Sequence, residues 1–304
     1  MTRPALAPSV IPCRLHDNIQ FLYELRLACL EVEAAGAKAE IGEDYRQVGA
    51  RGLADPGAFA RRSAYFADVG GRRSRYADIQ KASVTRSINQ YLTHWFYPYK
   101  GKFHPQMIRA LANILKVPEG GRVLDPFIGS GTTALECQLL GIDGVGLDIS
   151  PLCVAVSSAK VQSLGVLEDL RRLAGAPEGE KDLFSGAADP ARGNAHVRTF
   201  FQVADLIAAS DAGRRGRDRG KARDENLRRM LASVEAYAGV RDSLGLAPGR
   251  WEIREGDALE LPFESCSFDA VITSPPYSIA LDYMANDADA TEENVMRHMA
   301  NVSA

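Results

Sequence analysis

Residues 122–133 read Arg-Val-Leu-Asp-Pro-Phe-Ile-Gly-Ser-Gly-Thr-Thr, a short apolar run that leads through an acidic residue into a glycine-rich turn. The β-branched and apolar residues of 122–127 predict a strand, and the spacing of 132–140 predicts a helix. Gly129 and Gly131 between them allow a sharp turn and leave room for a ligand against the main chain. This strand, turn and helix decide the fold, because they are the first unit of a ligand-binding α/β sheet.

The alternation of strand and helix continues beyond this unit. A second strand is predicted over 144–149, and Pro151 opens a second helix that reaches about Leu164. Third and fourth strands are predicted over 251–256 and 267–273. Strands separated by helices favour a parallel sheet with right-handed crossovers, so the predicted fold class is α/β.

Two regions lie outside this alternation. Residues 1–90 have helical spacing over 15–35 and are then polar and arginine-rich, which predicts a helical and irregular N-terminal region. Residues 165–250 are too long for a crossover loop. Their helical spacing over 197–209 and 224–244 predicts a helical insertion, and the basic run Arg214–Arg223 is predicted as its exposed loop.

Composition sets limits on the function. The chain has 304 residues, of which 46% are hydrophobic and 25% charged, as in soluble globular proteins. No apolar run approaches the ~18–20 residues that a membrane span needs. The net charge of −3 excludes a protein whose whole surface binds polyanions, although it allows a local basic face. Five scattered cysteines without zinc-ligand spacing predict reduced thiols in a cytoplasmic protein, with Cys137 and Cys153 in the core.

The glycine loop predicts a nucleoside-like ligand. No Lys-Ser/Thr pair follows its second glycine and the full dinucleotide spacing is missing, so a pyrophosphate is not expected. Asp148 ends the second strand, where it can accept hydrogen bonds from ribose hydroxyls, and Asp257 follows the third strand, where it can accept from an adenine amino group. Alternatively, the glycines form a simple tight turn and the aspartates cap helices.

The fourth strand ends in Thr273-Ser274-Pro275-Pro276-Tyr277. The two prolines fix the backbone and lack N–H groups, which leaves carbonyl oxygens free as acceptors. The Ser274 side chain and the Pro275 carbonyl are predicted to hold the two protons of an exocyclic base amine, while Tyr277 stacks on the flipped base. The plainer alternative is a strand end with a packing tyrosine.

The segments DPFIGSGTT and TSPPY together resemble the S-adenosylmethionine-dependent DNA amino-methyltransferases, which modify N4 of cytosine or N6 of adenine. Residues 99–105 (YKGKFHP) resemble the segment that closes over the methionine part of the cofactor in this family. The resemblance covers about 91–160 and 251–283. It implies a Rossmann-like class I methyltransferase sheet, within a domain made of 91–164 and 251–304.

The resemblance also implies the site residues. The S-adenosyl-L-methionine contacts it implies are Lys100, Asp125, Phe127, Gly129, Ser130, Gly131, Thr132, Asp148 and Asp257, and the catalytic turn is Ser274, Pro275, Pro276 and Tyr277. A serine before Pro-Pro-Tyr favours cytosine N4 over adenine N6. Methyl transfer from a sulfonium to nitrogen needs positioning rather than a metal or a covalent nucleophile. The alternatives are an RNA amine methyltransferase, or a non-catalytic chain that needs a partner.

Two basic segments predict DNA as the partner. Residues 72–109 carry eight Lys and Arg against Asp78 alone, with six aromatic residues from Tyr91 to Phe103. Residues 214–223 carry six basic residues and one acidic residue. The alternative is that the charges form a solvated face and the aromatic residues belong to the core.

The length conflicts with a complete sheet. Only 27 residues follow Tyr277, whereas the family has three more strands beyond strand four and one βαβ unit takes about 30 residues. We therefore expect a sheet that is incomplete after strand four, in a truncated chain or in one whose sheet a second polypeptide completes.

Overall fold

The computed structural model describes residues 9–83, 85, 87–99, 101–174 and 193–275. Its central sheet has the order β8-β7-β6-β9 and every pair is parallel. The four strands span Arg122–Asp125 (β6), Asp143–Asp148 (β7), Trp251–Glu255 (β8) and Ala270–Val271 (β9). The predicted α/β class and its parallel sheet are therefore confirmed. The expectation that the sheet stops after strand four concerns residues beyond 275, outside the described part of the chain.

The two faces of the parallel sheet are covered differently. On one face, Val123 packs in a core with α4 (Pro105–Ile114) and α5 (Thr132–Leu139). On the other face, Leu124, Val145 and Leu147 are covered by Phe263 and Phe268 from the segment between β8 and β9. Because side chains alternate along a strand, Val123 and Leu124 point to opposite faces and belong to different cores.

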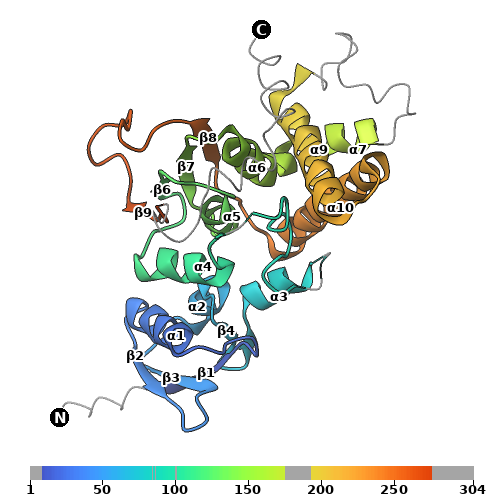
Figure 1. Cartoon of the computed structure of the whole chain (residues 1–304). Helices are drawn as coiled ribbons and strands as arrows, with labels where there is room; N and C mark the ends of the chain where they lie inside the picture. The colour runs from blue at the N-terminus through green and yellow to red at the C-terminus, as the bar shows by residue number, and fades with distance from the viewer. Residues whose placement is uncertain (1–8, 84, 86, 100, 175–192, 276–304) are drawn as a thin grey trace, which may run out of the picture.

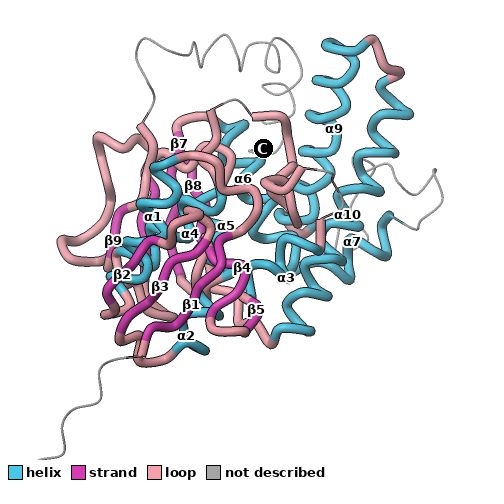
Figure 2. Tube along the Cα trace, turned by 90° about the horizontal axis from the view of Figure 1, so that it is seen from below, coloured by secondary structure: helices cyan, strands magenta, loops and turns pink. Residues whose placement is uncertain are grey.

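The N-terminal region is a separate antiparallel sheet, at the bottom of Figure 1 and seen from below in Figure 2. Its order is β2-β3-β1-β4-β5, with β1 Val10–Leu15, β2 Lys38–Ile41, β3 Gln47–Arg51, β4 Phe66–Val69 and β5 Arg72–Arg73. The same region of the chain contains three helices: α1 (Leu22–Ala34), α2 (Pro56–Arg62) and α3 (Arg75–Lys81).

The prediction of a helical and irregular N-terminal region was therefore wrong, although α1 confirms the helix expected within 15–35. The strands were missed because they are short and only half buried. In β1, for example, Cys13 and Leu15 point inward while Arg14 is exposed. Partners distant in sequence stabilise such strands, so local periodicity carries little signal.

The insertion is helical, as predicted. Helix α6 (Pro151–Gln162) continues through a 3₁₀ turn at Ser163–Val166 into α7 (Leu167–Ala174), and α9 (Ala195–Arg215) and α10 (Arg219–Leu244) pack beside it (Figure 1). The predicted basic loop over 214–223 was wrong: both helices extend into it and only residues 216–218 join them. Gly216 adopts a left-handed φ of 62° that ends α9, and Asp218 caps α10.

Within the described residues, no helix combines the length and apolar character needed to cross a membrane.

Candidate cofactor site

The glycine loop lies between β6 and α5, at the carboxyl end of the parallel sheet. Gly129 and Gly131 have φ values of 50° and 75°, a region in which other residues are strained. A Cβ atom at Gly131 would lie 2.8 Å from the Ser157 side chain on α6. The loop backbone therefore packs directly against α6, and only glycine fits at position 131.

Asp148, at the end of β7, holds this loop in place. Its Oδ2 accepts a hydrogen bond from the Gly129 N–H at 2.9 Å, and its Oδ1 accepts from the Ser150 N–H at 2.9 Å. Burial raises the pKa of the Asp148 carboxyl above its usual value. The Asp148 side chain therefore braces the loop through both of its carboxylate oxygens.

Asp125 connects the glycine loop to the end of strand four. The side chain is buried, and its Oδ1 accepts hydrogen bonds from the Phe127 N–H at 3.2 Å and the Thr273 hydroxyl at 2.7 Å. Burial raises the pKa of Asp125 to about 6. The bond to Thr273 brings the following residue, Ser274, beside the loop.

These elements line a small cleft of about 40 Å³. It is lined by Tyr99, Gly101, Lys102, Phe103, Asp125, Phe127, Ile128, Gly129, Ser130, Thr132, Thr133 and Ser274. Six of the predicted site residues are thus brought together. Gly131 and Asp148 support the loop without lining the cleft, whereas Asp257 is exposed and accepts a hydrogen bond from the Leu259 N–H at 2.9 Å. Pro275 follows Ser274 and is exposed; Lys100, Pro276 and Tyr277 lie outside the described residues.

The cleft has donors that suit an anionic or acceptor-rich ligand. The hydroxyl groups of Ser130 and Thr132 are buried in its wall and have no partner within the described structure. Helix α5 begins at the loop without a side-chain cap, so its first N–H groups are also available. Lys102 adds a cation to the same wall. This set of donors suits the carboxylate of a ligand.

Sequence reasoning missed Lys160, which lies directly behind the loop. This residue of α6 is fully buried, and its ammonium group donates to the Ser130 carbonyl at 2.5 Å. Burial lowers the pKa of Lys160 well below its usual value. The available signal was a lysine among small apolar residues of the helix predicted after Pro151.

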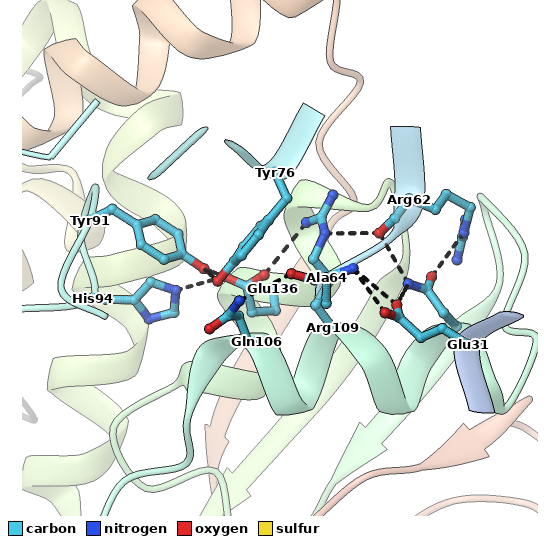
Figure 3. A network of polar contacts seen from close by, with 10 residues as sticks. Glu31, Arg62, Ala64, Tyr76, Tyr91, His94, Gln106, Arg109 and Glu136 are labelled. Carbon is cyan, nitrogen blue, oxygen red and sulfur yellow. Dashed lines mark hydrogen bonds and ion pairs between the residues drawn. The ribbon is translucent and has the colours of Figure 1, made fainter. Parts of the chain in front are cut away.

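It also missed a buried polar network around Glu136 of α5, shown in Figure 3. The carboxylate lies 2.8 Å from His94 Nε2 and 3.5 Å from Arg109 Nη1, and it accepts a hydrogen bond from the Tyr91 hydroxyl. Burial lowers the pKa of His94 to about 4, so its ring is neutral and donates to Glu136 rather than forming an ion pair. The network fixes the residues that precede the cleft wall at Tyr99.

The predicted basic face over 72–109 is not continuous. Arg109 is fully buried against Glu136, and Arg73 pairs with Asp78 at 2.5 Å. The core contains Tyr91, Trp95, Phe96 and Tyr97. The interpretation of this segment as one interleaved basic and aromatic surface was therefore wrong for Arg109 and these aromatic residues, because their side chains fill the interior. Arg72 and Lys81 are exposed, and Arg86 lies outside the described chain.

Acidic residues also offset the second basic run. Arg215 and Arg217 both lie within 4 Å of Asp211, and Arg217 also pairs with Glu225. Arg223 pairs with Asp205 at 2.5 Å. These acidic residues belong to neighbouring turns of α9 and α10 and lie outside residues 214–223, so the count of charges within that run did not include them.

Across the described ranges, no three His, Cys, Asp or Glu side chains gather in a way that suits a metal ion. Cys137 and Cys153 are buried, as predicted.

In open α/β sheets, ligands bind in the crevice at the carboxyl ends of the strands, which is where this glycine loop and cleft lie. Residues 80–158 match the family model described as DNA methylase. This match confirms the resemblance drawn from the motifs.

Curated relatives match about a quarter of this chain. The type II methyltransferase M.MjaII of Methanocaldococcus jannaschii is 40% identical over 74 residues, 24% of this chain and 14% of the relative. The type II methyltransferase M.BsoBI of Geobacillus stearothermophilus is 39% identical over 70 residues, 23% of this chain and 14% of the relative. A tRNA (guanine(10)-N2)-dimethyltransferase of Methanothermobacter thermautotrophicus is 35% identical over 74 residues, 24% of this chain and 21% of the relative. The match therefore spans at most about a fifth of these relatives' length.

Proposed function

We propose that this chain transfers a methyl group from S-adenosylmethionine to an exocyclic amine of a DNA base, with cytosine N4 as the favoured target and adenine N6 as the alternative. The observation that carries the proposal is the cleft in which Ser274, the residue before Pro-Pro-Tyr, lies beside Asp125 and the glycine loop. The match to DNA methylases supports it.

The cofactor would lie along the carboxyl end of the sheet. When bound, it supplies an electrophilic methyl group on its sulfonium. The α5 N-terminus, the Ser130 and Thr132 hydroxyls and Lys102 would hold its carboxylate, and Asp148 would accept bonds from its ribose. Ile149, which is 69% exposed directly after Asp148, offers an apolar surface for the adenine ring.

The catalytic turn would position the target amine. The Ser274 hydroxyl and the Pro275 carbonyl would accept hydrogen bonds from the two N–H groups of the amine, which weakens delocalisation of the nitrogen lone pair into the base. Methyl transfer leaves a cationic nitrogen, which then loses one proton to solvent. The Thr273 to Asp125 hydrogen bond fixes the start of this turn relative to the glycine loop. Orientation of the nitrogen toward the methyl group then supplies most of the acceleration.

Nucleoside analysis tests the proposal. Purified protein is incubated with labelled S-adenosylmethionine and either DNA or RNA, and the digested products are identified by mass spectrometry. We expect N4-methylcytosine in DNA, loss of product with Ser274→Ala, and unchanged product with Ser267→Ala, which removes an exposed hydroxyl of the β8–β9 segment. Detection of N6-methyladenine would identify adenine as the target base. Cofactor binding without any methylated product would overturn the proposal that this chain is active by itself.

RNA is the second candidate substrate. Two tRNA (guanine(10)-N2)-dimethyltransferases match over 74 and 76 residues at 35% and 41% identity. A methylated amine in the RNA reaction, with none in the DNA reaction, would establish this alternative.

A further inference from the structure

Three consecutive large apolar side chains are exposed at the start of α1. Phe21, Leu22 and Tyr23 are 60%, 82% and 52% exposed, and we call them the aromatic tip. The rings of Phe21 and Tyr23 are stacked, with centroids 5.6 Å apart and planes at 15°. Single exposed apolar residues are common, but this is the one consecutive run of three among the described residues.

The backbone of the aromatic tip is held firmly although its side chains are not packed. Glu24 is buried, and its Oε2 accepts hydrogen bonds from the N–H groups of Gln20 and Phe21 at 2.8 and 3.0 Å. Leu25, next in the helix, is buried in the core of the N-terminal sheet. The tip therefore presents its rings from a fixed turn, which lowers the entropy lost when they bind a partner.

The aromatic tip lies at the same end of the molecule as the cleft. Helices α1 and α4 pack side by side (Figure 1). At their starts, Asn18 donates to Gln106 at 2.6 Å, and at their ends Asn113 donates to Glu31 at 2.7 Å. The two helices are therefore parallel. Helix α4 begins two residues after Phe103, which lines the cleft, so the start of α1 is also on the cleft side.

Three arginines lie on or contact the segments that flank the tip. Arg26 lies one helical turn after Leu22, and the Arg46 guanidinium donates to the Ile19 carbonyl at 2.9 Å. Arg14 lies in β1, 3.5 Å from Asp17. The acids that face these cations are Asp17 and Glu33, in pairs exposed enough to exchange partners readily. Stacked rings with arginines on the flanking segments match the chemistry of unstacked nucleic-acid bases and their phosphates.

We propose that the aromatic tip is a DNA contact that stacks on bases left unstacked beside the flipped target, while Arg14, Arg26 and Arg46 bind the adjoining phosphates. The proposal rests on the proposed function, because extrusion of a target base is what exposes its neighbours. Apolar side chains occupy such gaps in other DNA-bending and base-extruding proteins.

The test compares binding of fluorescein-labelled duplexes, with and without a mismatch, by fluorescence anisotropy. The triple variant F21A/L22A/Y23A is expected to bind the mismatched duplex about tenfold more weakly or worse, as loss of base stacking implies. F21W/Y23W, which keeps two rings, retains affinity, and the affinity for S-adenosylmethionine is unchanged in both. Leu115→Ala, which removes an exposed apolar residue at the other end of α4, is the matched control and leaves DNA affinity unchanged.

The arginines have a separate signature. Replacement of Arg14, Arg26 and Arg46 by alanine should reduce the slope of log affinity against log salt by about 2 to 3, near 0.9 for each phosphate that is no longer neutralised. An unchanged slope would overturn their role.

Other outcomes separate this proposal from the proposed function. Equal DNA affinity of the wild type and a folded triple variant, checked by thermal melting, overturns the tip contact while DNA methylation by the wild type stands. A wild-type dimer in sedimentation that the triple variant dissociates, with DNA affinity unchanged, makes the tip an interface between copies and also overturns it. A wild type that neither binds nor methylates nucleic acid overturns both proposals.

Discussion

Lys160 stands out at the scale of single residues, because its charge is fully buried and the bond described for its ammonium group goes to the Ser130 carbonyl. A buried charge costs several kcal/mol, and an apolar residue of similar volume often replaces it without loss of stability. A residue so costly to the fold is expected to act on the loop that it contacts.

Lys160→Met should therefore weaken S-adenosylmethionine binding by about 0.5–1.5 kcal/mol, the range for one hydrogen bond to the loop, while the free energy of unfolding stays the same or rises. Calorimetry and urea unfolding measure the two quantities. Val161→Ala, the next buried residue of α6, is the control: it should lose ~2 kcal/mol of stability and keep its affinity. Equal affinity of Lys160→Met and the wild type would contradict a loop-positioning role.

Asp148 combines the loop brace with the proposed ribose contact. Asp148→Ala should weaken cofactor binding by ~1–3 kcal/mol, the cost of lost bonds to a charged acceptor. A cofactor analogue without the ribose 2′-hydroxyl separates the two roles by calorimetry. The wild type should bind this analogue more weakly than the cofactor, whereas Asp148→Ala should bind the two ligands almost equally. If the variant loses as much affinity as the wild type when the hydroxyl is removed, the carboxylate only braces the loop.

At the scale of elements, the Glu136 network joins three parts of the fold. Glu136 belongs to α5, Arg109 to α4, and Tyr91 and His94 to the segment that leads to the cleft wall (Figure 3). From α4, Asn113 reaches Glu31 of α1. Helix α4 therefore carries polar contacts from the N-terminal sheet domain to the helix that follows the glycine loop.

Glu136→Leu should destabilise the fold by about 3–5 kcal/mol, because Arg109 would remain buried without its acid. Urea unfolding measures the loss. Glu235→Gln serves as the control, since the Glu235–Arg171 pair is on the surface and contributes less than about 1 kcal/mol. If Glu136→Leu lowers the free energy of unfolding by less than about 1 kcal/mol, apolar packing can replace the polar network without loss of stability.

At the scale of the whole molecule, buried histidines make stability depend on pH. Burial lowers the pKa of His16 to about 4, as it does for His94. The folded state keeps these rings neutral while the unfolded chain takes up protons below about 6.5. The stabilisation is therefore complete above about pH 6.5 and is lost as the pH falls toward about 4.

His16→Phe tests this dependence and keeps an aromatic ring against Tyr76, whose centroid lies 5.6 Å away. Between about pH 6.5 and 4, the free energy of unfolding of the variant should fall by up to about 3 kcal/mol less than that of the wild type. Unfolding experiments at several pH values measure this difference. Asp125 acts in the opposite sense: its pKa is raised to about 6, so the stability from its protonation is lost as the pH rises through 6. Because Asp125 is the same in both proteins, the test is the difference between their free energies of unfolding at each pH. If the two curves of unfolding free energy against pH are parallel, His16 does not cause the pH dependence.

Local sequence was sufficient for the glycine loop and the strands and helices around it. A strand, a turn with Gly129 and Gly131 and a helix all lie within residues 122–139, so local sequence is enough to define their pattern. The carboxyl ends of parallel strands meet at one edge, so the pattern also predicted that Asp125 and Asp148 approach the loop. Asp257 followed the same rule but is exposed.

Other features were decided by tertiary structure alone, because they depend on residues that are far apart in the chain. The N-terminal sheet is assembled from short strands with little periodicity, and Arg109 became an interior residue because Glu136 lies opposite it. Lys160 reached the glycine loop only when α6 packed beneath it. The sequence by itself determined the glycine loop and its resemblance to DNA methylases, because both depend on local spacing. The placement of charges, interior or exterior, was decided by packing, because burial is a property of the assembled core.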